Sequence, residues 1–371
     1  MSIFFNYFIY VLYNRMSTVL QNIIDYTLII AAFILVIYFI YSMITKNQVN
    51  KPMSKPPPFE DTPNATQRAQ LSKIEGTTTT SAIKNASFDA SNDNALRNYV
   101  IKSSSNSAYT NGYMNLNMIK YVLSKGCRFL DFEIYMKDNV PIVAYSTNKQ
   151  SLETFTSEAP AVSFSGVCST ILSNAFSETS PNSDDPLFLH LRIKTYDSTA
   201  YSKIAQIIKG GLGPKLYTES DGTAVPVNLD TQITDFLGKI VVIVDQHSSP
   251  GFQNYATCAP DTSDDCYSLT NVINLVSNSQ TVRTYSQSDL TYQPINPPDP
   301  GVYLFRIVFP NIGFFGSTKN SDAQYLIRNY GVQVVAQAFY VNDSNLRSYE
   351  AIFADKKSAF VRLENVINVY E

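Results

Sequence analysis

The stretch GCRFLDFEIY (residues 126–135) decides the fold. After Gly126 its apolar residues alternate with polar ones, so that Asp131 and Glu133 lie on one face of a predicted strand. PLFLHLRIK (186–194) repeats this pattern and places its histidine and arginine on one face. KIVVIVD (239–245) is apolar at nearly every position, as a strand buried on both faces of a parallel sheet requires.

Helical patterns separate these strands. MNLNMIKYVLSKG (114–126) carries apolar residues at helical spacing and ends on glycine, and further helical patterns begin at residues 167 and 201. Later strand patterns start at residues 303, 332 and 359. This alternation over 95–371 predicts an α/β fold, and specifically a (β/α)8 TIM-type barrel. A doubly wound sheet is the alternative, but no glycine-rich phosphate loop follows the first strand.

The first 94 residues have a different composition. We interpret 1–22 as an apolar, interfacial segment, 23–45 as a transmembrane helix and 46–94 as a disordered linker rich in Pro, Thr and Ser. These features predict a single-pass membrane protein. Lysines after the span weakly favour a cytosolic barrel. Frequent Asn, Ile and Tyr would suit a viral or protist membrane protein, including one of a virion membrane.

Charge and cysteine content limit the partners. The chain has 28 basic and 31 acidic residues among 371, a net charge of -3, so it offers no excess cation for nucleic acid. Cys258 and Cys266 are close enough in sequence to form a disulfide. Four cysteines in a chain of this length do not indicate an oxidising compartment, and the pairing stays open.

The motifs, taken in order, resemble the phosphoinositide-specific phospholipase C family. GCRFLDFEIY (126–135) and GVQVVAQAF (331–339) are the strongest matches, supported by YVIKSSSNSAY (99–109), PIVAYST (141–147) and LFRIVFPNIG (304–313). The resemblance implies one barrel of the phospholipase-C-like phosphodiesterase kind over 95–371. Its first half, equivalent to the family's X region, would cover 95–247, and its Y-like half 300–371.

The same resemblance indicates lost catalytic groups. The family uses two histidines, one to deprotonate the inositol hydroxyl and one to protonate the leaving oxygen. Here those positions are Ser105 and Ser146, and a serine hydroxyl carries neither proton near neutral pH. His247, predicted at the barrel mouth, is a weak substitute, whereas His190 lies deeper and fits a core position. We therefore expect no intact catalytic pair and lean towards a pseudoenzyme.

The family's calcium site also matches only in part. Asn106, Asp131 and Glu133 correspond in kind to three ligands, but Arg192 stands where the family has a glutamate. A guanidinium there supplies the positive charge itself, so we expect no cofactor and regard calcium as disfavoured. These four residues form either a ligand-site remnant or an internal salt-bridge cluster. Metal-free bacterial relatives carry an arginine near this place, so phosphodiester binding stays compatible with Arg192.

These observations predict a membrane-anchored, catalytically inactive phospholipase-C-like protein with a binding or structural role. Its partners would be membrane lipid through the N-terminal helix and a phospholipid or protein at the barrel mouth. Phe314 and Phe315, in the loop GFFG, are candidates for a membrane or partner contact, with burial in the core as the alternative. The alternative function is a divergent, metal-independent phosphodiesterase acting on lipid head groups, with Arg192 at the phosphate.

Overall fold

The computed structural model of the chain separates into two units, Met1–Pro58 and Phe59–Glu371. In the first unit only a short helical segment, Ile34–Ile37, is described. All further description concerns the second unit. The described residues are 34–37, 63–76, 81–89, 91, 93–145, 161–259, 266–292, 304–312 and 318–367.

The predicted single-pass localisation is corrected. Within the described ranges, no helix has both the length and the apolar character needed to cross a bilayer. Of the stretch 23–45, only Ile34–Ile37 is described, and four helical residues rise about 6 Å against a hydrocarbon core of about 30 Å. The rest of that stretch, together with the interfacial segment 1–22, lies outside the described residues.

The main sheet has the strand order β5-β4-β3-β6-β7-β8, with β2 on the other side of β3. Strands β2, β3, β6, β7 and β8 run parallel, whereas β4 and β5 form an antiparallel extension. Every residue of β7 is buried, as its apolar sequence predicts. The bounds are β2 (Ser103–Ser104), β3 (Phe129–Lys137), β4 (Val140–Val143), β5 (Val162–Ser163), β6 (Leu187–Ile193), β7 (Ile240–Asp245) and β8 (Leu275–Ser277).

A second parallel sheet has the order β13-β10-β9, with β9 (Val282–Ser286), β10 (Phe305–Phe309) and β13 (Val334–Val335). It joins the first through a parallel bridge between Ser104 and Gln337. The two sheets also meet between β8 and β9, where the described residues form no backbone ladder. There the side chain of Asn278 accepts a hydrogen bond from the backbone of Thr284 at 3.1 Å.

The described part of the chain therefore places eight parallel strands in the order β2, β3, β6, β7, β8, β9, β10 and β13. The α/β class is confirmed. The predicted barrel is not closed by a continuous ladder, because side chains replace backbone pairing between β8 and β9. The strand predicted from residue 359 lies outside this parallel arrangement, since β14 (Phe360–Arg362) pairs antiparallel with β1 (Tyr99–Ile101).

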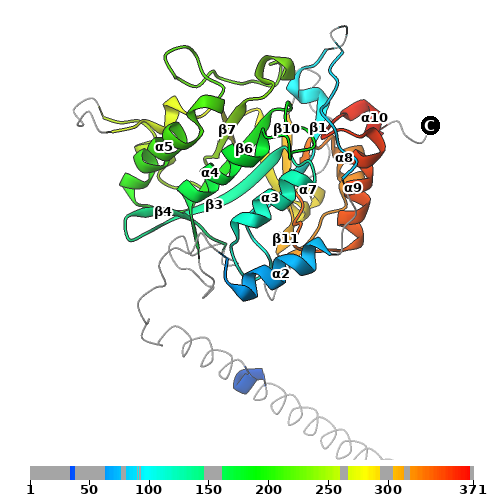
Figure 1. The fold of residues 1–371 in the computed structure, drawn as a ribbon, viewed down its shortest axis with the longest axis horizontal. Helices are drawn as coiled ribbons and strands as arrows, with labels where there is room; N and C mark the ends of the chain where they lie inside the picture. Colours follow the sequence, from blue (N-terminus) through cyan, green and yellow to red (C-terminus); the bar gives the residue numbers. More distant parts are fainter. Residues whose placement is uncertain are drawn as a thin grey trace, which may run out of the picture. The chain divides into compact units, whose positions relative to one another are not determined.

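The helices lie on the outside of the strands (Figure 1). Their inner faces are apolar, and their N-termini are capped by short polar side chains such as Asp197, which accepts from the Thr199 amide. The principal helices are α3 (Leu116–Ser124), α4 (Phe164–Ala175), α5 (Ser198–Leu212), α8 (Ala323–Tyr330) and α9 (Ser344–Lys356). Shorter elements are α6 (Phe252–Tyr255), α7 (Gln287–Tyr292), α10 (Leu363–Ile367), and the paired strands β11 (Asn311–Ile312) and β12 (Thr318–Lys319).

Part of the predicted linker is folded. Residues 65–75 form α2 (Ala65–Glu75), which Asn64 and Gln67 begin with a reciprocal capping box. Leu71 and the Gln67 side chain are buried, and the Gln67 carbonyl accepts from Asn115. The disordered-linker interpretation of 46–94 is therefore corrected for this segment, because capping and burial compensate for its weak apolar periodicity.

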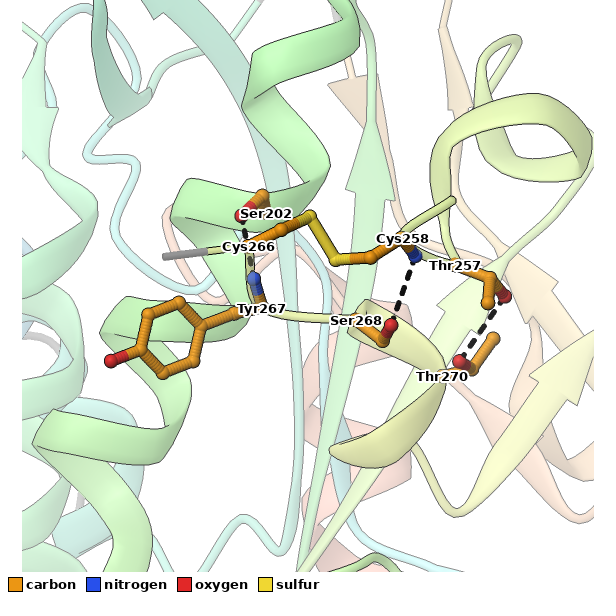
Figure 2. The surroundings of a disulfide bond; sticks show 7 residues. All are labelled: Ser202, Thr257, Cys258, Cys266, Tyr267, Ser268 and Thr270. Atoms are coloured by element: carbon orange, nitrogen blue, oxygen red, sulfur yellow. Dashed lines mark hydrogen bonds between the residues drawn. A yellow bond between two sulfur atoms is a disulfide. The ribbon is translucent and has the colours of Figure 1, made fainter. Parts of the chain in front are cut away.

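The Cys258–Cys266 pairing, open from the sequence, is a disulfide (Figure 2). Hydrogen bonds flank it on both sides: the Cys258 amide donates to Ser268 Oγ, and the Tyr267 amide donates to Ser202 Oγ on α5. The disulfide thus closes the connection after α6, and the bond to Ser202 holds that connection against α5. Cys127 and Cys168 are reduced and buried, and burial raises the pKa of the Cys127 thiol to about 12.

Removing this disulfide should lower stability. For a loop this short, we expect the double variant Cys258→Ser/Cys266→Ser to lose about 2–3 kcal/mol of unfolding free energy, because the unfolded chain regains freedom. Denaturant unfolding measures the effect. Wild type in strong reductant should match the variant, and equal midpoints for the variant and oxidised wild type would contradict the expectation.

Candidate functional site

A cavity of about 930 Å³ opens where the parallel strands end, and it collects most of the residues singled out from the sequence. Its wall includes Ser105, Asn106, Glu133, Arg192 and His247. Asp131 is fully buried, is not part of the wall, and accepts a hydrogen bond from Arg192. Ser146, Phe314 and Phe315 lie outside the described residues.

The turn after β2 brings Asn106 to the cavity. Asn106 adopts a left-handed backbone conformation (φ 46°), which asparagine tolerates better than most residues. This conformation lets its amide donate to Asp131 Oδ2 at 3.0 Å. Ser107 secures the turn, because its Oγ accepts from the Asp131 amide and donates to the Ser104 carbonyl.

The Arg192 guanidinium lies at the centre of the predicted residues. Its Nε and Nη2 donate to the two carboxylate oxygens of Asp131, at 2.9 and 2.5 Å. Nη1 donates to Glu133 Oε1 at 2.8 Å, and Nη2 also donates to Asn106 Oδ1 at 3.1 Å. These bonds use four of the five N–H donors of the arginine. The guanidinium also lies 4.9 Å from the centre of the Phe309 ring.

The charges of this cluster stabilise one another. Burial by itself raises the pKa of Asp131, but Arg192 and the hydrogen bond from His190 outweigh it and hold that pKa well below its usual range. Glu133 has a lowered pKa for a similar reason, with Arg192 and Lys194 opposing the effect of burial. The two carboxylates in turn raise the pKa of Arg192 despite its burial. All three groups are therefore charged at neutral pH.

Two partners of Glu133 were not predicted. Lys194 Nζ lies 3.0 Å from Glu133 Oε2, and the Tyr135 hydroxyl donates to the same oxygen at 2.8 Å. The signal for Lys194 was present, because it continues the period-two series of His190 and Arg192 along β6.

The two histidines occupy different environments. His190 is completely buried, with Nδ1 2.8 Å from Asp131 Oδ1 and Nε2 3.0 Å from Ser277 Oγ. It has no access to a molecule in the cavity. His247 follows β7 and is exposed in the cavity wall, as predicted for a residue at the mouth.

A second polar group, also missed from the sequence, surrounds Asp245 at the end of β7. Its carboxylate accepts from Ser248, Ser277, Asn278 and Thr284. Burial raises the pKa of Asp245, but the nearby His190 and these donors outweigh it, so the net shift is downward. Ser248 follows Asp245 by three residues, whereas the other donors come from β8, β9 and their connection, and no local pattern linked these to Asp245.

The residues do not fit a calcium ion. Calcium needs several free oxygen atoms, whereas both Asp131 oxygens, Glu133 Oε1 and Asn106 Oδ1 already accept from Arg192. Across the described ranges, no cluster of three or more His, Cys, Asp or Glu side chains is arranged to hold a metal ion.

The strand arrangement and the polar cavity at the strand ends define an α/β domain with the site position of a barrel enzyme. Residues 92–246 match the profile of the phosphatidylinositol-specific phospholipase C X domain. This part of the chain is therefore similar to the X domain of that family.

Solved structures show the same fold. PLC21 from L. pealei and PLC21 from S. officinalis each superpose with a TM-score of 0.56 at 18% identity, covering 75% and 76% of this chain. The chain spans only 38% of the length of each. At this identity the likeness establishes the fold alone. No curated protein sequence matches the chain.

Replacing Arg192 should destabilise the domain strongly at neutral pH. Arg192→Met leaves Asp131 and Glu133 charged in a buried site, so we expect a loss of about 3–5 kcal/mol of unfolding free energy. Arg283→Met is the matched control, because Arg283 is exposed in the same wall and has no ion-pair partner in the described part. It should change stability by less than about 0.5 kcal/mol.

The loss in Arg192→Met should depend on pH. Both carboxyl pKa values are lowered in the folded wild type, so their stabilisation is present above the unfolded values of about 4 and disappears as pH falls through the folded ones. The difference between variant and wild type should therefore shrink in acid. A deficit that is the same at pH 7 and pH 3 would contradict the ion-pair explanation.

Proposed function

We propose that this chain is a phospholipase-C-like protein whose domain binds a ligand in the cavity without hydrolysing a phosphodiester. The observation that carries the proposal is the engagement of Arg192 by Asn106, Asp131 and Glu133. A phosphate arriving at this guanidinium would find one N–H donor left and two carboxylates beside it. Strong phosphate binding normally uses two parallel N–H donors.

The proton carriers support the same proposal. Phosphodiester cleavage by this family's chemistry needs a base and an acid, and the resemblance assigns both positions to serine, Ser105 and Ser146. The chain has two histidines. His190 is fully buried, so His247 alone is accessible from the cavity and would supply half of an acid–base pair.

Hydrolysis is tested directly with the full-length chain. Phosphatidylinositol and glycerophosphodiesters, each with calcium or chelator, are expected to give no turnover above buffer, with an active bacterial phospholipase C as positive control. Turnover that disappears in Arg192→Ala or His247→Ala, and persists in the control Arg347→Ala, an exposed arginine on α9 outside the cavity, would overturn the proposal in favour of a divergent phosphodiesterase.

Calcium independence is the second part of the proposal. Because Arg192 occupies the ligand oxygens, calcium should leave the thermal midpoint of wild type unchanged relative to chelator. Arg192→Glu supplies a fourth oxygen ligand in place of the cation, so we expect this variant to gain a calcium-dependent rise in midpoint. A calcium-dependent rise in wild type itself would contradict the expectation.

A further inference from the structure

Among the described residues, the cavity wall has no excess of positive charge to attract an anionic head group. We propose that it binds an uncharged pyranose sugar, such as a unit of a neutral glycan. This inference rests on the proposed binding function and names its ligand class. Four observations support it: positive charges matched in number by negative ones, a saturated buried carboxylate, free neutral hydrogen-bonding groups and fixed aromatic faces.

Two of the three cations that line the described part of the wall are paired with carboxylates. Arg192 binds both Asp131 and Glu133, and Lys194 binds Glu133, so these two cations face two anions. Arg283 and Asp289 are exposed in the same wall and have opposite signs. No excess positive charge remains among these groups to balance a phosphate.

Asp245 leaves a negative charge in the wall. Its carboxylate is only 2% exposed and already accepts from several hydroxyl and amide groups. An anion in the cavity would lose hydration and gain repulsion from Asp245, whereas a neutral molecule meets no such penalty. His247, also in the wall, is exposed to solvent.

Neutral polar groups dominate the wall and some are available to a ligand. Asn106 uses its Oδ1 to accept from Arg192, and its side-chain NH₂ has no acceptor within the described ranges. The Ser105 hydroxyl likewise lacks a partner among the described residues, although Ser105 is only 4% exposed. Hydroxyl groups of a sugar both donate and accept, so they can satisfy these groups without bringing charge.

Aromatic rings line the same cavity and are held in place by the fold. Tyr145 and Tyr340 are buried, and both pack against Tyr109, with ring centroids 4.3 and 4.8 Å apart. Tyr285 and Phe309 complete the aromatic part of the wall. Rings fixed in this way provide apolar surfaces for the C–H faces of a sugar, while neighbouring amides and hydroxyls bind its edges.

The test compares matched ligand pairs on the full-length chain. Mannose, N-acetylglucosamine and galactose are titrated beside their monophosphate esters by calorimetry and saturation-transfer NMR, at low and high salt. Myo-inositol, the ring of the resembled family's substrate, is titrated separately, and its binding does not count as support. We expect at least one neutral ring to bind, its ester to bind no tighter, and the affinity to be independent of salt. Tyr285→Ala should weaken binding about tenfold, whereas Tyr325→Ala, an exposed tyrosine on α8 outside the cavity, should not.

Three results would overturn the inference. The first is an ester that binds about tenfold tighter than its neutral partner. The second is an affinity that falls steeply with salt. The third is the absence of binding of every neutral ring to protein that circular dichroism shows to be folded. Failure of the proposed function is separate, because it appears as phosphodiester turnover. If turnover were found, a measured preference for neutral rings would still stand. If esters were preferred without turnover, the neutral-ring inference would fail and the proposal of an inactive domain would stand.

Discussion

The Arg192 guanidinium joins β6 to β3 and to the turn after β2 through Glu133, Asp131 and Asn106. Buried carboxylates are tolerated only when they are paired and hydrogen-bonded. Asp131, which has no exposed surface, therefore depends on Arg192, His190 and the Asn106 amide together. The position of the β2 turn, and hence the floor of the cavity, follows from this requirement.

This arrangement separates the fold from the chemistry usually associated with it. The domain keeps the site position at the ends of the parallel strands, where ligands bind in barrel enzymes. The charges at that position, however, are directed at one another and not at the cavity. Function therefore has to be argued from the site and not from the fold.

Much of the candidate site was predictable because strand periodicity is local. Alternation along 128–135 and 186–194 put Asp131 and Glu133 on one face of their strand and Arg192 on one face of the next. β3 and β6 pair in parallel with Glu133 beside Arg192. Lys194 was missed although the same periodicity marks it. Asn278 and Thr284 carry no such signal, because their link to Asp245 depends on how β7, β8 and β9 meet.

The sequence by itself determined the α/β class and the buried strands, since these follow from residue identity and short-range spacing. Tertiary structure decided the rest. It closed the Cys258–Cys266 disulfide, packed α2 against the domain and left the ladder open between β8 and β9. It also decided that Arg192 contacts its neighbours in the cluster, because pairing between distant charges depends on their distance and burial, which spacing along the chain does not specify.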